Sequence, residues 1–237
     1  MKSLVSLLAA FCILLVGPLR AQDVAPPNPV VVELFTSQGC ASCPPADAMI
    51  AELAAREDVI ALALHVDYWD YIGWVDEYAN PAHTRRQKAY ARIAGRNMIY
   101  TPQIIVNGLD EIEGARPMKL ADRIMAQHQR PAVIKMTAAR DGQKMQVKAR
   151  AVGTLPDGML IIQLVRYSPL QHARITDGEN AGRNLDYANV VKAWDVLAKW
   201  DGVAPLDLTA DLPGDAAAAV LIQQEGPGAI VAAARVR

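Results

Sequence analysis

Two cysteines separated by two residues are the feature of this sequence best suited to chemistry. Cys40 and Cys43 enclose Ala41–Ser42, and the one other cysteine, Cys12, lies in the apolar N-terminal run. A disulfide between such close neighbours closes a very short loop, so it removes little chain entropy and stabilises the fold only slightly. A thiolate in such a pair can instead attack another disulfide, and the second cysteine can then displace the bound partner. The pair therefore predicts thiol–disulfide exchange, with Cys40 as the attacking thiol and Cys43 as the resolving thiol.

The same pair has two plainer interpretations, a static disulfide and half of a zinc site. Structural zinc takes four ligands, often from two Cys-x-x-Cys pairs. The sequence has no second pair, and its four histidines, at positions 65, 83, 128 and 172, show no metal-ligand spacing with one another. We therefore expect no metal and no cofactor, and we expect protein thiols or disulfides as the substrates. A regulatory or inert disulfide remains an alternative.

The segments around the cysteines predict how they are positioned. The run Val30–Phe35 is typical of a buried strand, and Val59–Val66 predicts a second one. Between them, Asp47–Arg56 has the spacing of an amphipathic helix, so the order favours a right-handed parallel unit. A turn that opens a helix exposes its residues, and free backbone N–H groups there favour negative charge. We therefore expect the sulfur of Cys40 to be exposed.

Two prolines directly after Cys43 affect this expectation. Pro44 and Pro45 lack a backbone N–H and are tolerated only in the first turn of a helix. We expect them to push the regular helix downstream and to leave Cys40 in a looser nest of N–H groups. The thiol pKa would then be lowered less strongly.

Further elements follow as far as residue 129. Asn80–Pro81 is typical of a helix start, and this helix is predicted to run to about Ala94. Strands at 103–106 and 109–113 flank the hairpin signal Asn107–Gly108, and Arg116–Gln129 predicts a closing helix. The aromatic residues of segment 68–74 lie between the second strand and the first of these helices. They either line a peptide groove or pack onto the sheet.

This order of elements resembles the thioredoxin superfamily over roughly residues 30–129. In that superfamily a cis-proline faces the cysteine pair and presents backbone to an extended substrate. The resemblance implies a cis Thr101–Pro102 bond, with Thr101 and Pro102 holding the substrate strand. The sequence departs from the pattern at Gly39, where a tryptophan is usual. The Ala41–Ser42 dipeptide between the cysteines does not indicate the reduction potential of the pair.

Glu33 is a second residue that the resemblance singles out. Thioredoxins carry a buried acid on this strand that helps to deprotonate the resolving thiol, and Glu33 matches it if one residue is inserted before Cys40. Burial of an unpaired carboxylate is costly and raises its pKa. The alternative is that Glu33 points to solvent or pairs with a basic residue.

A closer resemblance extends over most of the chain. The segments Glu33–Asp47, Asp67–Asp70 and Gly178–Arg183 are similar to those of a family of secreted bacterial proteins with a thioredoxin-like domain and no established function. The loop Gly178–Arg183 is interpreted either as a domain contact or as a partner site.

The pattern changes after Gln129–Pro131. Short predicted strands separated by turn residues, beginning with the hairpin signal Asp141–Gly142, favour a small β-sandwich. The predicted fold class is thus an α/β thioredoxin-like domain, residues 22–129, followed by a small all-β sandwich-like domain, residues 130–237.

The first residues have the form of a targeting signal. Lys2 precedes the apolar run Leu4–Val16, and a small-residue cleavage site follows at Ala21, so residues 1–21 predict a signal peptide. An uncleaved anchor is the alternative. We expect a periplasmic or secreted protein with no stable membrane insertion after cleavage. The net charge of −1 and the lack of basic runs argue against nucleic acid as a partner.

Together these features predict an exported thiol–disulfide oxidoreductase that acts on protein substrates, with a redox partner protein as a further possible contact. The alternative is a thioredoxin-like binding or redox-sensing module that recruits a partner without catalysis.

Overall fold

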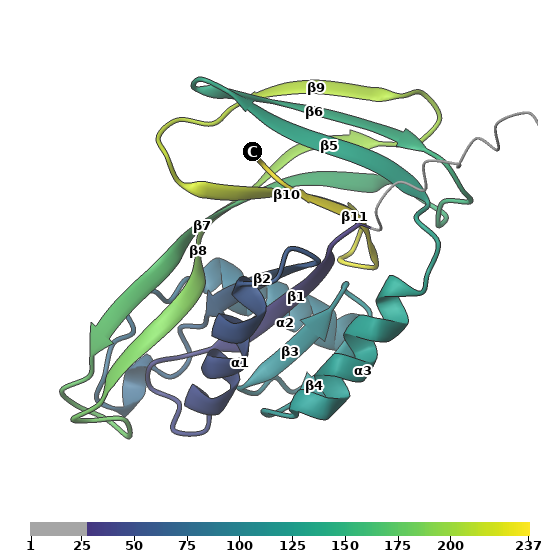
Figure 1. Ribbon diagram of the computed structural model, residues 1–237. Coiled ribbons are helices and arrows are strands. Elements are labelled where there is room, and N and C mark those ends of the chain that lie inside the picture. The colour runs from purple at the N-terminus through teal and green to yellow at the C-terminus, as the bar shows by residue number, and fades with distance from the viewer. Residues whose placement is uncertain (1–27) are drawn as a thin grey trace, which may run out of the picture.

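The computed structural model describes residues 28–237 (Figure 1). The predicted signal peptide, residues 1–21, lies outside the described residues. In chain order the elements are β1 (Val30–Thr36), α1 (Pro44–Ala54), β2 (Val59–His65), the 3-10 turn η1 (Asp70–Ile72), α2 (Pro81–Ile93), β3 (Gln103–Val106), β4 (Asp110–Glu113), α3 (Pro117–His128), β5 (Ile134–Asp141), β6 (Lys144–Ala151), β7 (Leu160–Arg174), β8 (Asn184–Trp200), β9 (Leu206–Asp211), β10 (Ala217–Gln224) and β11 (Ile230–Arg235).

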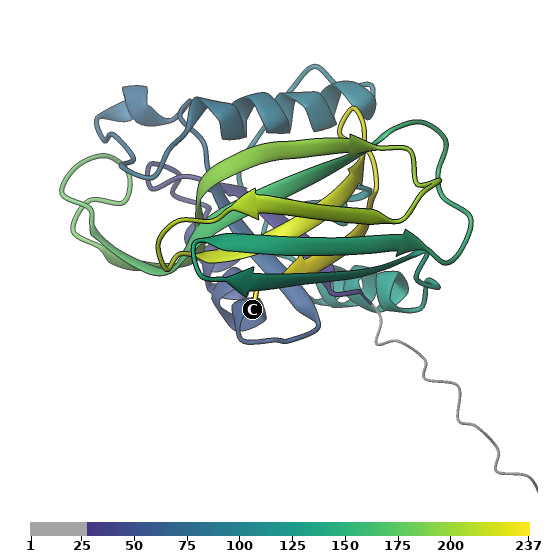
Figure 2. The same ribbon diagram turned by 90° about the horizontal axis from the view of Figure 1, so that it is seen from above.

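The fold is a mixed α/β fold dominated by one large sheet. Eight strands lie in the order β11-β10-β7-β8-β2-β1-β3-β4, and β5-β6-β9 form a separate three-stranded sheet. The pairs β1–β2 and β2–β8 are parallel, whereas the other pairs of the large sheet are antiparallel. The small sheet lies over the β7, β10 and β11 end of the large one, and apolar side chains of both sheets pack between them (Figure 2).

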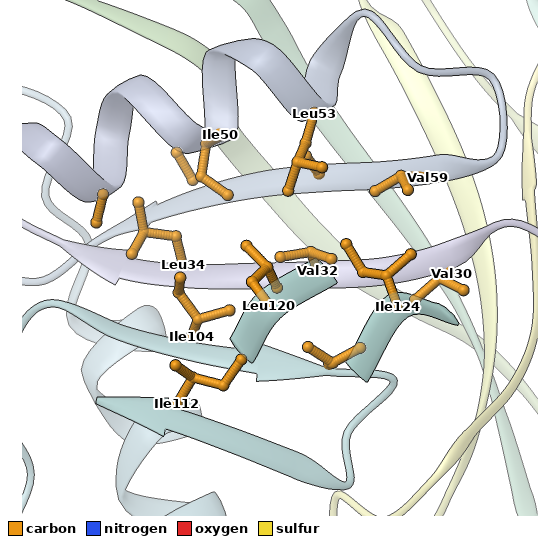
Figure 3. Packing of buried hydrophobic residues seen from close by; sticks show 14 of the residues in the cluster. Val30, Val32, Leu34, Ile50, Leu53, Val59, Ile104, Ile112, Leu120 and Ile124 are labelled. Carbon is orange, nitrogen blue, oxygen red and sulfur yellow. The ribbon is translucent and has the colours of Figure 1, made fainter. Parts of the chain in front are cut away.

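Strand β1 lies at the centre of the α/β part. All seven of its residues are buried, because helices cover both faces of the sheet. Val30, Val32 and Leu34 pack against Ile50 of α1 and Ile124 of α3 (Figure 3). The alternate side chains of β1 pack toward α2 on the opposite face. Burial of each such aliphatic side chain contributes about 1.5–3 kcal/mol, so β1 is a rigid base for the segment that follows it.

Helix α1 begins at Pro44, three residues before the predicted start. The expectation that the two prolines displace the helix is therefore wrong. Pro44 and Pro45 occupy the first two helical positions, with Cys43 as the N-cap residue. The N–H groups that proline lacks have no intrahelical partner at these positions in any helix, so the prolines cost little there.

The other helices and the hairpin lie where the sequence predicts them. The side chain of Asn80 caps α2 by accepting a 2.9 Å hydrogen bond from the backbone N–H of Ala82. Strands β3 and β4 form the predicted hairpin, and α3 follows it. Among residues 28–237, no helix is both long enough and apolar enough to cross a membrane.

The large sheet continues across the predicted domain boundary at residue 130. Strand β8 joins β2 through the pair Ala63–Val190, and the side chain of Asn189 donates a 2.9 Å hydrogen bond to the carbonyl of Ala61. Strands β7 and β8, of 15 and 17 residues, are longer than the short strands that the sequence predicts, and they extend as a two-stranded ribbon beside the α/β part (Figure 1). The sequence does not indicate these extensions, because their residues are largely polar and lack the apolar pattern of a strand. The division into two domains stays a prediction.

Candidate functional site

Cys40 and Cys43 are joined by a disulfide in the segment between β1 and α1. The backbone N–H of Cys43 donates a 3.2 Å hydrogen bond to the carbonyl of Cys40, which closes the short turn. Ala41 and Ser42 form the exposed tip of this turn. The structure therefore brings the two predicted redox residues together at the strand–helix junction.

The sulfurs are enclosed, and the expectation of an exposed Cys40 is wrong for this conformation. Cys40 is 1% exposed and Cys43 is fully buried. The reason is tertiary, because two segments distant in sequence cover the turn. One is the segment 69–74 after β2, and the other is the loop Gly178–Arg183 between β7 and β8, which we call the cap loop.

Trp69 forms the first part of this cover. A Cβ atom at Gly39 would lie 3.2 Å from the Cβ of Trp69 and 3.6 Å from Ile72, so Gly39 leaves the room that these side chains use. A tryptophan at position 39 would have no space. The indole of Trp69 also donates a 2.7 Å hydrogen bond to the hydroxyl of Thr101, and that of Trp74 donates one to Gln38. Trp69 and Trp74 thus pack in this structure, and a role of the aromatic segment in a peptide groove stays a prediction.

Thr101 and Pro102 lie at the same end of the sheet as the cysteines. Their peptide bond is cis, as the resemblance implies. Gln103, the next residue, pairs with Phe35 near the end of β1. Trp69 lies between the two segments, since it packs against Gly39 and is bonded to Thr101.

The cap loop forms the second part of the cover. The side chain of Asn180, 1% exposed, donates hydrogen bonds of 2.8 Å to the carbonyl of Gln38 and 3.0 Å to that of Cys40. Arg183 donates to the side-chain oxygen of Asn180 at 2.9 Å. The carboxylate of Glu179 accepts a 3.4 Å hydrogen bond from the backbone N–H of Ala41. Of its two predicted roles, the loop has the contact role in this structure.

A buried polar cluster lies beneath the turn. Asp76 accepts a 2.7 Å hydrogen bond or ion-pair contact from the ring of His65 and a 2.8 Å bond from the backbone N–H of Gln38. Asp47, in the first turn of α1, accepts a 2.8 Å hydrogen bond from the hydroxyl of Thr36. The sequence does not indicate that Asp47 and Asp76 lie beside the cysteines, since neither has a distinctive spacing to them apart from the one helical turn between Cys43 and Asp47.

Asp47 has the environment of a proton acceptor. Burial raises the pKa of its carboxyl to about 7, against the opposing effects of His65 and the Thr36 hydroxyl. Its second oxygen and the hydroxyl of Tyr187 have no hydrogen-bond partner among the described residues. Both side chains line a cavity of about 240 Å³ beside Pro44 and Arg183. Asp47 can therefore gain or lose a proton near neutral pH.

Glu33 pairs with a basic residue, which is one of the alternatives to a catalytic role. It is fully buried and pairs with Arg86, whose guanidinium approaches its carboxylate to 2.6 Å. The hydroxyl of Tyr90 also donates to it at 2.6 Å. Both partners belong to α2, on the face of β1 opposite α1. Among residues 28–237, no hydrogen bond links Glu33 to the cysteine turn, and no cluster of three or more metal-ligating side chains forms.

Comparison with known proteins gives a family but no activity. Residues 31–223 match the family model described as "Protein of unknown function (DUF1223)". A crystal structure of protein AGR_C_4864 from Agrobacterium tumefaciens is similar, with 33% identity, a TM-score of 0.75, and coverage of 87% of this chain and 92% of that one. HBP35 of Porphyromonas gingivalis shares the fold at 14% identity, with a TM-score of 0.62 and coverage of 88% and 74%. Among curated proteins, none matches.

Proposed function

The chain belongs to the DUF1223 family, whose function is unknown, and we propose that it is an exported thiol–disulfide oxidoreductase with a thioredoxin-like α/β part. The observation that carries this proposal is the Cys40–Cys43 disulfide at the junction of a buried strand and a helix. The Thr101–Pro102 segment at the same end of the sheet supports it. The export proposal depends on the predicted signal peptide and is tested by fractionation of cells.

The exchange reaction replaces one disulfide bond with another, and the electrons gained by one partner are lost by the other. The thiolate of Cys40 attacks one sulfur of a substrate disulfide, so a mixed disulfide forms, the substrate bond breaks and one substrate thiolate leaves. The thiolate of Cys43 then attacks the sulfur of Cys40, and the second substrate thiolate leaves. The substrate gains two electrons and the protein loses two. In the reverse direction, the protein disulfide oxidises a substrate dithiol.

Asp47 is the proposed proton acceptor for Cys43. It lies one helical turn after Cys43, where its backbone N–H donates to the Cys43 carbonyl at 3.1 Å. A base whose pKa is near the working pH exchanges protons efficiently, and the pKa of Asp47 is about 7. Asp47 thus replaces Glu33 in the role that the resemblance assigned to a buried acid, because Glu33 is held by Arg86.

The segments that cover the turn prevent this reaction in the conformation described. Cys40 is 1% exposed, so a protein substrate cannot reach its sulfur in the conformation described. The proposal therefore requires the cap loop, the segment 69–74, or both to move aside.

The same enclosure favours a second candidate, a binding or redox-sensing module without catalysis. In that case the exposed tip, Ala41–Ser42, and its surroundings contact a partner. Replacement of both cysteines leaves partner capture unchanged if the module only binds, and abolishes it if the module senses redox state.

A trapping experiment separates these candidates. Cys43→Ser protein is mixed with a disulfide-containing protein substrate, and covalent adducts are measured on non-reducing gels. The oxidoreductase forms adducts that disappear with thiol reductant, whereas the matched Cys40→Ser variant forms few, because it lacks the proposed attacking thiol. Wild-type protein should also exchange with dithiothreitol and reduce or oxidise the substrate over many turnovers. Absence of both adducts and turnover refutes the enzyme.

A further inference from the structure

The backbone donors near Cys40 are few. Pro44 and Pro45 have no N–H, and the N–H of Cys43 is used by the carbonyl of Cys40 at 3.2 Å. The N–H of Ala46 in turn donates to the carbonyl of Cys43 at 2.8 Å. The amides of Ala41 and Ser42 are therefore the backbone donors left between the two cysteines to stabilise a thiolate, beside the Ser42 hydroxyl, which lies 3.4 Å from the Cys40 sulfur.

Glu179 occupies one of these two donors. Its carboxylate accepts from the N–H of Ala41 at 3.4 Å, a long hydrogen bond whose effect is largely electrostatic. The position of Glu179 is not incidental, because the next residue, Asn180, is buried and bonded to the carbonyls on both sides of Gly39. The cap loop thus fixes a negative charge beside the turn that carries the reactive sulfur.

We propose that Glu179 is a positioning residue that makes the thiol of Cys40 less acidic and the Cys40/Cys43 pair more reducing. This inference rests on the proposed function. A carboxylate close to a thiolate disfavours the thiolate, and occupation of the Ala41 N–H withdraws a donor from it. Destabilisation of the reduced, thiolate-bearing state favours the disulfide and lowers the reduction potential.

Other charges also face the turn. Arg183 belongs to the cap loop, Asp76 accepts from Gln38, and His65 and Asp47 lie in the cluster beneath. A change at Glu179 leaves all four in place, so the difference between variant and wild type reports on Glu179 alone.

Three variants of the full chain test the proposal. Glu179→Gln keeps an acceptor for the Ala41 N–H but removes the charge, and Glu179→Ala removes both. Asp177→Asn is the matched control, since Asp177 is an exposed neighbour that bonds to Thr176 and not to the turn. For each reduced protein, the pH dependence of Cys40 alkylation gives the thiol pKa, and equilibrium with glutathione gives the potential.

Because Glu179 is exposed and partly screened, we expect a moderate effect. Glu179→Gln should lower the pKa of Cys40 by about half a pH unit and shift the glutathione equilibrium about threefold toward reduced protein, or about 15 mV. Glu179→Ala should shift the pKa of Cys40 and the glutathione equilibrium at least as far, and Asp177→Asn should match wild type in both measurements. The difference should shrink in 1 M salt, where the Debye length is about 3 Å.

The inference is overturned if Glu179→Gln has the wild-type pKa and potential, or if the shift is equally large in Asp177→Asn. A failure of the proposed function has a different signature. Wild-type protein would then exchange with no protein substrate, while alkylation of Cys40 would still show whether Glu179 controls its acidity.

Discussion

The side-chain amide of Asn180 donates a 3.0 Å hydrogen bond to the carbonyl of Cys40, 140 positions earlier in the chain. A residue of the β7–β8 loop thus helps to hold the turn that bears the disulfide. With its second bond to Gln38, Asn180 satisfies two carbonyls that the loop itself shields from water. Asn180 is therefore the buried side chain through which the cap loop is held on the turn.

Asn180→Ala should loosen the cap loop and expose the disulfide. The variant leaves the buried carbonyl of Gln38 without a partner, whereas the carbonyl of Cys40 keeps the backbone N–H of Cys43. We therefore expect a loss of about 1–3 kcal/mol in the free energy of unfolding, the cost of one unsatisfied buried group. Reduction of the disulfide by dithiothreitol should become at least several-fold faster. Urea unfolding and reduction kinetics measure the two effects.

Asn184→Ala is the control for this experiment, because Asn184 is exposed at the start of β8. It should resemble wild type in both measurements. If Asn180→Ala is reduced no faster than Asn184→Ala, the cap loop does not limit access to the sulfurs.

Asp47→Asn should change how stability depends on pH. The pKa of Asp47 is about 7 in the folded protein and near its usual 3.8 in the unfolded chain. Between these values the folded state holds a proton that the unfolded state has released, so the free energy of unfolding falls as pH rises. Asparagine does not ionise, so at this position it gives the free energy of unfolding no such dependence on pH. The variant should match wild type near pH 4 and exceed its stability increasingly up to about pH 8.

Urea unfolding at a series of pH values measures this difference, and subtraction of one curve from the other cancels the titration of the histidines. Parallel curves for the two proteins would show that Asp47 is ionised in the fold at all these pH values.

Arg86→Met should destabilise the protein strongly. Glu33 is fully buried, and the variant leaves its carboxylate without a cationic partner, which costs about 3–5 kcal/mol. Arg85→Met, at an exposed position of the same helix, should change stability by less than about 0.5 kcal/mol. Glu33→Gln combined with Arg86→Met should recover part of the loss. A loss below about 1 kcal/mol in the single variant would contradict the role of this pair, as measured by urea unfolding.

Gly39→Trp should destabilise the protein. The space beside Gly39 already holds Trp69 and Ile72, so we expect overpacking to cost about 1–3 kcal/mol or more. Trp69→Ala in the same chain makes room and should offset part of that cost. A double-mutant cycle measures the coupling between positions 39 and 69. Independent, additive effects would show that the two side chains do not compete for one space.

The sequence predicts those parts of the fold whose signal is local. β1 and β2 were recognisable because both faces of each strand are buried, which gives an uninterrupted apolar run. Pro44 and Pro45 do not displace the helix, since a missing N–H group matters inside a helix and not in its first turn.

The part of the site that could not be predicted is the cover. Enclosure of Cys40 depends on Trp69, which follows β2 beside the end of β1, and on Asn180, which meets the turn because β8 pairs with β2. No local pattern encodes that contact. The importance of Asp47 was equally hidden, because its pKa follows from burial and not from its neighbours in sequence.

The single bridge between Ala63 and Val190 also bears on how the chain can be divided. A protein shortened to end at residue 129 would lack β8, and the edge of β2 that β8 now lies against would be uncovered. Such an edge is a template for intermolecular pairing, so the fragment should self-associate more than the intact protein. The later strands therefore act as a shield against aggregation for the part of the molecule that carries the cysteines.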